Sequence, residues 1–73
     1  MAKSFHITNQ IRKLRFFAGE MTQMELAEKV GASRQTIIAI EAGKYSPSLE
    51  LAFRIAQAFE VPISEVFTYE EET

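Results

Sequence analysis

The chain has 73 residues, of which 47% are hydrophobic and 25% are charged, and its net charge is −2. A chain this short buries only about 60% of the surface that its unfolded form exposes, so we expect residues 1–73 to form one small domain. Cysteine is absent and there is one histidine. This composition excludes disulfides and a Cys/His zinc site, and we expect neither a metal nor a cofactor.

The sequence contains no apolar run that approaches the roughly 18 residues of a membrane span. Its first residues also lack the apolar stretch of a secretory signal, so we expect a cytoplasmic protein with no membrane partner. Three glutamates, Glu70 to Glu72, gather at the C-terminal end, and without them the net charge would change from −2 to +1. This balance is weak for a nucleic-acid-binding domain, so composition neither indicates nor excludes DNA as a partner.

Capping and turn residues divide the chain into five short helical segments between two extended ones. Residues 5–7 are aromatic and β-branched, which favours a strand. Asn9 is a candidate N-cap for a first helix over about residues 10–18, and Gly19 ends that helix. The first predicted helix therefore follows the first strand almost directly.

The second helix is predicted from a capping box. Thr22 and Glu25 are spaced so that each side chain can accept a hydrogen bond from the backbone of the other. The helix is expected to run to about Lys29 and to be broken by Gly31. Its inward-facing residues are expected to be Leu26, Ala27 and Val30.

The third and fourth helices both follow a serine. Ser33 caps a helix over about residues 34–42 that ends at Gly43, and Ser48 caps a helix that continues to Phe59. The fourth helix has one apolar stripe at helical spacing, which predicts that these residues are buried: Leu49, Ala52, Ile55, Ala56 and Phe59.

The last segments are a one-turn helix that starts at Pro62 and a short extended run at residues 67–69. That run alternates as a strand does and could pair with residues 5–7. The expected fold class is therefore all-α with five helices, and a small two-stranded antiparallel sheet can join the N- and C-terminal segments.

The most informative stretch lies between Thr22 and Gly43. Two short helices are separated by residues 30–33 only, with Gly31 in the turn. A sharp crossing of two helices over so short a turn needs a left-handed backbone position, which glycine adopts at little cost. Ala27 allows the helices to approach closely, and the second helix can then enter a DNA major groove about 12 Å wide.

At many spaced positions the sequence resembles the Cro/C1-type (Xre) helix-turn-helix family: Gln23-x-x-Leu26-Ala27-x-x-Val30-Gly31-x-Ser33-Arg34-Gln35-Thr36-Ile37-x-x-Ile40-Glu41-x-Gly43-Lys44-Tyr45-x-Pro47-Ser48-Leu49. The resemblance covers about residues 11–67 and is closest to minimal members, which are repressors without a ligand domain. Only the loop at residues 18–21 departs from the commonest form, being one residue longer. The resemblance implies a sequence-specific regulator of transcription that binds double-stranded DNA, with no small-molecule ligand.

Four residues on the outer face of the third helix are candidates for base recognition: Arg34, Gln35, Ile38 and Ala39. Arginine can bond guanine O6 and N7, glutamine can bond adenine N6 and N7, and apolar side chains can contact thymine methyl groups. Two alternatives stay open. Arg34 can contact phosphate only, and Ile38 can pack under a neighbouring helix.

Five further residues are candidates for contacts with the DNA backbone: Gln23, Ser33, Thr36, Lys44 and Tyr45. Gln23 opens the second helix, whose N-terminus favours anions, and the resemblance implies a phosphate contact there. The resemblance implies the same role for Lys44 and Tyr45. Ser33 is first of all a helix cap, and Thr36 can instead bond within its own helix.

The resemblance also implies a buried ion pair between the first and third helices, formed by Arg15 and Glu41. The alternative is a surface pair worth less than about 1 kcal/mol. In either case the role of the pair is structural rather than a contact with DNA.

A homodimer is expected because one recognition helix gives only a small contact with DNA. A two-fold dimer places two such helices about 34–36 Å apart and reads a palindromic operator. The apolar residues around the fifth helix are the candidate interface: Phe59, Pro62, Ile63, Val66 and Phe67.

Other functions use the same fold. An antitoxin-type or phage-type regulator would have the same DNA surface, and a protein-interaction adaptor would use the fold without DNA. An enzyme is not expected, because the sequence has no cysteine, no histidine near a nucleophile and no glycine-rich phosphate loop.

Overall fold

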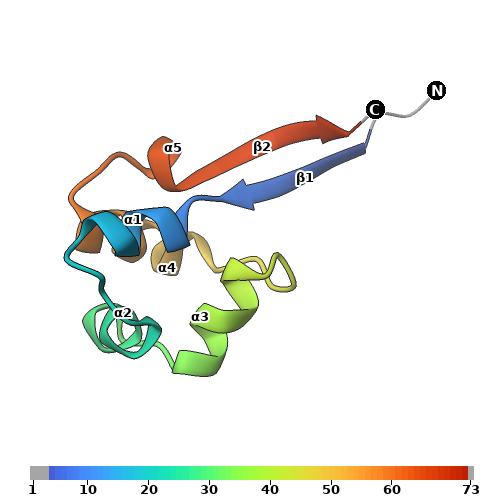
Figure 1. The fold of residues 1–73 in the computed structure, drawn as a ribbon. Helices are drawn as coiled ribbons and strands as arrows, with labels where there is room; N and C mark the ends of the chain where they lie inside the picture. Colours follow the sequence, from blue (N-terminus) through green and yellow to red (C-terminus); the bar gives the residue numbers. More distant parts are fainter. Residues whose placement is uncertain (1–3, 73) are drawn as a thin grey trace.

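The computed structural model describes residues 4–72. Over this range five helices stand between two strands (Figure 1), which agrees with the predicted five-helix fold and its small antiparallel sheet. In chain order the elements are β1 (Ser4–Asn9), α1 (Ile11–Phe17), α2 (Gln23–Val30), α3 (Arg34–Glu41), α4 (Leu49–Phe59), α5 (Ile63–Val66) and β2 (Phe67–Glu72).

The two strands form an antiparallel ribbon that extends away from the helices (Figure 1). Each strand has six residues, which is longer than the three predicted from the sequence. The register pairs Ile7 with Tyr69 and Asn9 with Phe67. On the other face of the ribbon, the hydroxyl of Thr8 lies within hydrogen-bond distance of both Thr68 and Glu70.

Helix α1 begins at Ile11, one residue later than predicted, because the backbone of Gln10 takes the N-cap position. Asn9 still acts on this helix, since its side-chain oxygen accepts a hydrogen bond of 3.1 Å from the backbone N–H of Ile11. The amide nitrogen of Asn9 points the other way and donates to the carbonyl oxygens of Ile40 and Glu41. Asn9 thus connects the start of α1 to the end of α3.

The predicted caps of the three longer helices are present. Thr22 and Glu25 form the capping box of α2, and the hydroxyl groups of Ser33 and Ser48 accept hydrogen bonds from the first turns of α3 and α4. Gly31 ends α2 with φ of +72°, in the left-handed region that the short turn was expected to require.

Helices from the whole chain contribute to one apolar core. Its largest fully buried side chains come from α1, α2, α3, α4 and α5: Ile11, Leu26, Ile37, Ile40, Ile55 and Val66. The predicted inward residues of α2 are buried as well, including Ala27 with 1% exposure. The core therefore holds α2 and α3 against the rest of the domain.

Three expectations about burial need correction. Leu49 is 72% exposed rather than part of the buried stripe, because it is the first residue of α4 and lies outside the packed part of that helix. Val66 is fully buried and cannot contribute its side chain to a dimer contact, because the single turn of α5 directs it into the core. Ile38 and Ala39, expected on the exposed face of α3, are half-buried.

Candidate nucleic-acid interface

The exposed part of α3 is its N-terminal turn. Arg34 and Gln35, the first two residues of the helix, are both exposed, and the Ser33 cap fixes the direction of the backbone there. The arginine can donate two hydrogen bonds to a guanine edge or to a phosphate, and the glutamine can donate one hydrogen bond to an adenine edge and accept another from it. Ile38 and Ala39 lie one turn further on and are half-buried, so they present less surface to a ligand.

The hydroxyl groups of Ser33 and Thr36 already form hydrogen bonds within the N-cap of α3. The Ser33 hydroxyl oxygen accepts a hydrogen bond of 3.1 Å from the Thr36 backbone, and the two hydroxyl groups are 2.9 Å apart. These contacts favour the structural role that the sequence left open for both residues. A hydroxyl that already bonds inside the cap has less freedom to reach a phosphate.

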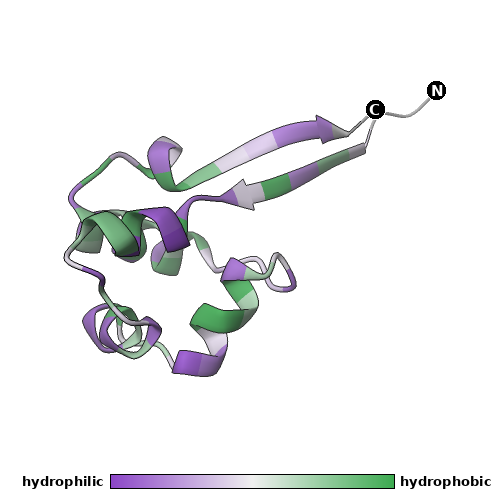
Figure 2. Cartoon of the chain, in the orientation of Figure 1, coloured by the Kyte–Doolittle hydropathy of each residue, from purple (hydrophilic) through white to green (hydrophobic). Residues whose placement is uncertain are grey.

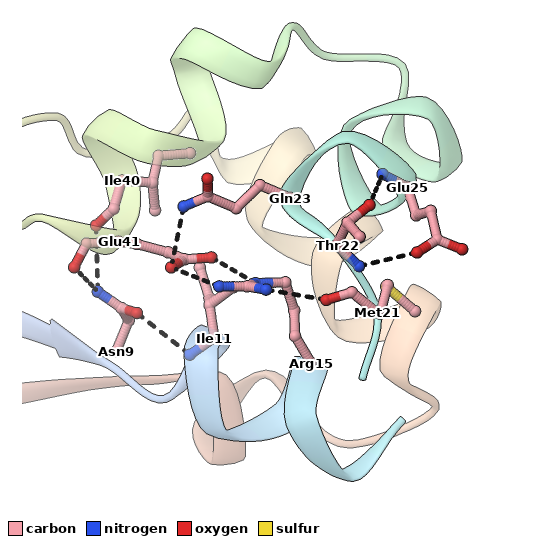
Figure 3. Close-up of polar contacts among 9 residues, drawn as sticks. All are labelled: Asn9, Ile11, Arg15, Met21, Thr22, Gln23, Glu25, Ile40 and Glu41. Atoms are coloured by element: carbon pink, nitrogen blue, oxygen red, sulfur yellow. Dashed lines mark hydrogen bonds and ion pairs between the residues drawn. The ribbon is translucent and has the colours of Figure 1, made fainter. Parts of the chain in front are cut away.

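Behind α3, Arg15 and Glu41 form the expected ion pair (Figure 3). Arg15 Nε lies 2.7 Å from Glu41 Oε2 and Arg15 Nη2 lies 3.0 Å from Oε1. The side chains are only 15% and 11% exposed. Arg15 Nη1 also donates to the backbone oxygen of Met21 at 2.8 Å. The guanidinium therefore joins α1, the loop before α2 and the end of α3.

Gln23 belongs to the same polar group (Figure 3). Its side-chain amide lies 3.4 Å from Glu41 Oε1, a long hydrogen bond, and the residue is half-buried. The amide group has a second N–H and a carbonyl oxygen, so one contact with Glu41 leaves it able to bond a further group. Gln23 is thus held in place at the start of α2, beside α3.

A shallow depression at the start of α2 is lined by one residue, Arg12, that was not among the candidates predicted from the sequence. Arg12, Gln23 and Arg34 line it together, with Arg15 and Glu41 behind them. Arg12 comes from α1 and is exposed. Two arginines from separate helices therefore border the start of α2, where backbone N–H groups also favour an anion. The signal in the sequence was weak, because an exposed arginine on a short helix is ordinary.

Lys44 and Tyr45 follow α3 in an exposed loop, with Tyr45 51% exposed. Tyr45 borders a groove together with residues of the sheet, among them Ile7 and Tyr69. Both residues are accessible to a ligand that contacts the C-terminal end of α3. The predicted base and phosphate residues thus occupy the two ends of α3 and the start of α2.

The described residues hold no cluster of three or more His, Cys, Asp or Glu side chains suited to a metal ion. Within residues 4–72 no helix is both long enough and apolar enough to cross a membrane.

A profile of the helix-turn-helix family matches residues 11–66, which span α1 to α5. The chain belongs to the helix-turn-helix family of the Cro/C1 (Xre) type. The family resemblance inferred from the spaced residues between Gln23 and Leu49 is thereby confirmed.

The similar helix-turn-helix proteins come from archaea and bacteria. The chain is 55% identical over 62 residues to an uncharacterized HTH-type transcriptional regulator of Methanocaldococcus jannaschii, covering 82% of this chain and 94% of that protein. It is 47% identical over 64 residues to another, YgzD of Bacillus subtilis, covering 88% and 96%. A phage CTXphi transcriptional repressor, RstR from Vibrio cholerae, is 34% identical over 64 residues, which are 88% of this chain and 57% of RstR.

Among solved helix-turn-helix structures, a proposed DNA-binding protein from Bacteroides fragilis has a similar fold. The TM-score is 0.73 at 26% identity, and the match covers 85% of this chain and 98% of that one. The arrangement of helices described above is therefore shared with a second protein of nearly the same extent. The curated relatives place the chain in a family of transcriptional regulators.

Proposed function

We propose that this helix-turn-helix protein is a sequence-specific transcriptional repressor that binds a palindromic double-stranded DNA operator as a homodimer in the cytoplasm. The observation that supports this most directly is the exposure of Arg34 and Gln35 on the first turn of α3. Base-reading side chains at the start of the second helix of this motif enter the major groove first.

The repressor role is supported by one comparison. A relative that is 34% identical is a phage repressor. A protein that occupies its site on DNA blocks transcription by competing with other proteins for that site.

We assign each candidate residue a role in DNA binding from its position in the structure. Gln35 and Arg34 read base edges, with Ile38 and Ala39 contributing apolar contacts from the next turn. Gln23, Lys44 and Tyr45 hold the DNA backbone on the two sides of the groove, and Ser33 and Thr36 act mainly by capping α3. Phosphate contacts fix the register of the protein on the duplex, and base contacts choose the sequence.

The decisive experiment is selection of bound duplexes from a random DNA pool, followed by binding measurements across a salt series. We expect enrichment of one inverted repeat with half-site centres about 34–36 Å apart. We also expect an affinity for this sequence at least about a thousandfold above that for scrambled DNA. A protein-interaction adaptor would enrich no sequence, and this result would reject the proposal.

A further inference from the structure

Helix α1 exposes two adjacent aromatic side chains that have no role in the proposed function. Phe16 is 62% exposed and Phe17 is 71% exposed, and their rings meet edge to face with centroids 5.5 Å apart. An aromatic side chain offers about 150–250 Å², so the two together leave roughly 250 Å² of apolar surface in contact with solvent. Adjacent exposed rings bordered by polar side chains are a feature of interaction sites, whereas single exposed apolar residues are ordinary.

The two rings line a groove, which we call the α1 groove, together with polar residues that precede them in the chain: Asn9, Gln10, Arg12 and Lys13. Arg12 lies one helical turn before Phe16, and Lys13 lies one turn before Phe17, so each cation and its ring share one side of α1. Figure 2 shows the same division along the helix, with a hydrophilic first turn and a hydrophobic last turn. The groove is thus cationic at one end and aromatic at the other.

No acidic side chain of the described chain pairs with the cations of the α1 groove. Within residues 4–72 neither Arg12 nor Lys13 forms an ion pair, and none of the residues that line the groove is acidic. Two glutamates come near α1 along the backbone. Glu20 follows the helix, and Glu65 adjoins the α5 residue whose carbonyl oxygen accepts from the Gln10 N–H at 2.9 Å, but neither glutamate lines the groove. The positive charge of the groove is therefore available to a ligand.

Cations beside exposed rings suit an acidic peptide segment that carries large apolar side chains. Its carboxylates can form charge-assisted hydrogen bonds with the guanidinium and ammonium groups, and a leucine or phenylalanine can cover the rings as an anchor. Duplex DNA offers phosphates to the cations, but a phosphate backbone would leave the two rings exposed. The chemistry of the groove thus favours a protein segment over DNA.

The overall charge of the protein argues against a membrane as the ligand of the groove. The net charge is −2, so a broad anionic bilayer would repel the protein as a whole. A short peptide confined to the groove meets mainly the local cations, because charges more than about 8 Å away are screened at physiological salt.

The α1 groove adjoins the candidate DNA surface through Arg12. This residue also borders the depression at the start of α2, together with Gln23 and Arg34. An acidic segment in the groove would therefore bring its carboxylates next to the phosphate that Arg12 is expected to contact. Like charges placed side by side repel each other strongly when they are partly shielded from water. A peptide in the groove and DNA at the depression should accordingly exclude each other.

We propose that the α1 groove is a docking site for an acidic segment of another protein, anchored by large apolar side chains, and that its occupation weakens binding to DNA. The effect on DNA rests on the proposed function, whereas the docking itself does not. The apolar area of the groove is small compared with the roughly 1,200 Å² of a stable interface, so the complex should be weak and transient. A partner of this kind would release the operator only while its local concentration is high.

The first test is selection of short peptides from a random displayed pool, with the full chain immobilised and DNA absent. We expect the retained peptides to be enriched in aspartate and glutamate around one or two large apolar residues. A pool without enrichment, or one enriched in basic peptides, would overturn the proposal.

The most enriched peptide, carrying a fluorescent label, then locates the site by anisotropy titrations. Phe17→Ser and Lys13→Glu should each raise the dissociation constant at least about tenfold, because the first removes a ring under the anchor and the second sets a carboxylate against the acidic peptide. The matched controls are Phe53→Ser, at a phenylalanine of α4 that is 52% exposed, and Lys29→Glu, at an exposed lysine of α2. Both controls should bind the peptide as the parent does, and losses equal to those of the first two variants would contradict docking in the groove.

A membrane is tested as the alternative ligand of the same groove. Cosedimentation of the parent with vesicles rich in phosphatidylserine, lost in Phe17→Ser, would assign the groove to lipid and overturn the proposal. We expect the parent to remain in the supernatant.

The effect on DNA is measured by adding the peptide to the complex of protein and selected operator. Saturating peptide should weaken operator binding by the parent at least about tenfold and leave binding by Phe17→Ser unchanged. An unchanged operator affinity of the parent would overturn the competition through Arg12. If the parent binds the peptide in the groove but no DNA sequence in its absence, the proposed function fails and the docking site stands.

Discussion

Arg15 donates two hydrogen bonds to the carboxylate of Glu41, at 2.7 and 3.0 Å, and so connects the C-terminal end of α3 to α1. Both side chains are largely buried. Because Gln23 also contacts Glu41, the ion pair positions the start of α2 relative to α3. The orientation of the candidate recognition helix thus depends on a contact that lies behind it.

The first prediction concerns the cost of breaking this pair. Glu41→Ala should lower the free energy of unfolding by about 3 kcal/mol, because it leaves the guanidinium of Arg15 largely buried without its carboxylate. The control is Glu50→Ala, which breaks the ion pair with Arg54. This pair is exposed, because the side chain of Arg54 is 52% exposed and that of Glu50 is 74% exposed. That change should cost less than about 1 kcal/mol. Thermal melts that show equal losses for both variants would contradict the structural role of Arg15 and Glu41.

The second prediction separates sequence choice from general affinity. Gln35→Ala should lose about 1–3 kcal/mol per half-site on the selected operator and little on scrambled DNA, because it removes a base contact. Lys44→Ala should weaken binding to both duplexes alike and reduce the slope of log K against log salt by about one per half-site. Circular dichroism should show both variants folded, since both residues are exposed. Equal weakening of both duplexes by Gln35→Ala would assign base recognition to Arg34 and Ile38 instead.

The third prediction tests the residue that the structure adds to the interface. Arg12 borders the depression at the start of α2 with Gln23 and Arg34, so Arg12→Ala should reduce the salt slope by about one per half-site. Lys13→Ala is the matched control, because Lys13 has the same charge and lies about 100° further round α1. If the two variants lose equal affinity, Arg12 acts through net charge rather than through a contact at the depression.

The fourth prediction concerns the capping box of α2. Thr22→Ala should lower stability by about 1 kcal/mol, because it removes the oxygen that accepts from the Glu25 backbone at 3.0 Å. The loss should appear in urea melts at neutral pH. An unchanged midpoint would mean that the cap contributes nothing to folding.

The capping box also predicts a pH dependence. Hydrogen bonds from the backbone N–H and then from the side chain of Thr22 hold the pKa of Glu25 below its ordinary value of 4.5. Because the pKa is lowered in the folded state, the stabilisation is present above the unfolded value and is lost as the pH falls through the folded one. The stability difference between the parent and Glu25→Gln should therefore shrink in acid, as urea melts across a pH series would measure. A difference that stays constant from neutral pH into acid would contradict this prediction.

Local features of the fold could be predicted from the sequence because their causes are local. Thr22 with Glu25, Ser33 and Ser48 act on backbone groups within three residues, and Gly31 is needed where the chain turns left-handed. Periodicity identified α4, but it could not show that the packed part of the helix begins after its first residue, Leu49.

Features that depend on distant segments could not be predicted. Asn9 was read as a cap, yet its amide also bonds the carbonyl of Ile40, 31 residues away. Arg12 becomes a candidate contact only because α1 lies beside the start of α2. An apolar residue such as Val66 suits both a dimer interface and the core, and only the direction of α5 decides that it faces the core. The Arg15 and Glu41 pair was expected solely through the family resemblance.

The ribbon pairs residues that are far apart in sequence, as the contact between Thr8 and Thr68 across 60 positions shows. Closing so long a loop costs chain entropy before any contact forms, so the ribbon should assemble after the helices during folding. Two strands alone are only marginally stable in water, so the ribbon should also be the first element to open. Amide hydrogen exchange should accordingly be fast in β1 and slow in α2, with the two strands separating while the helix-turn-helix stays intact.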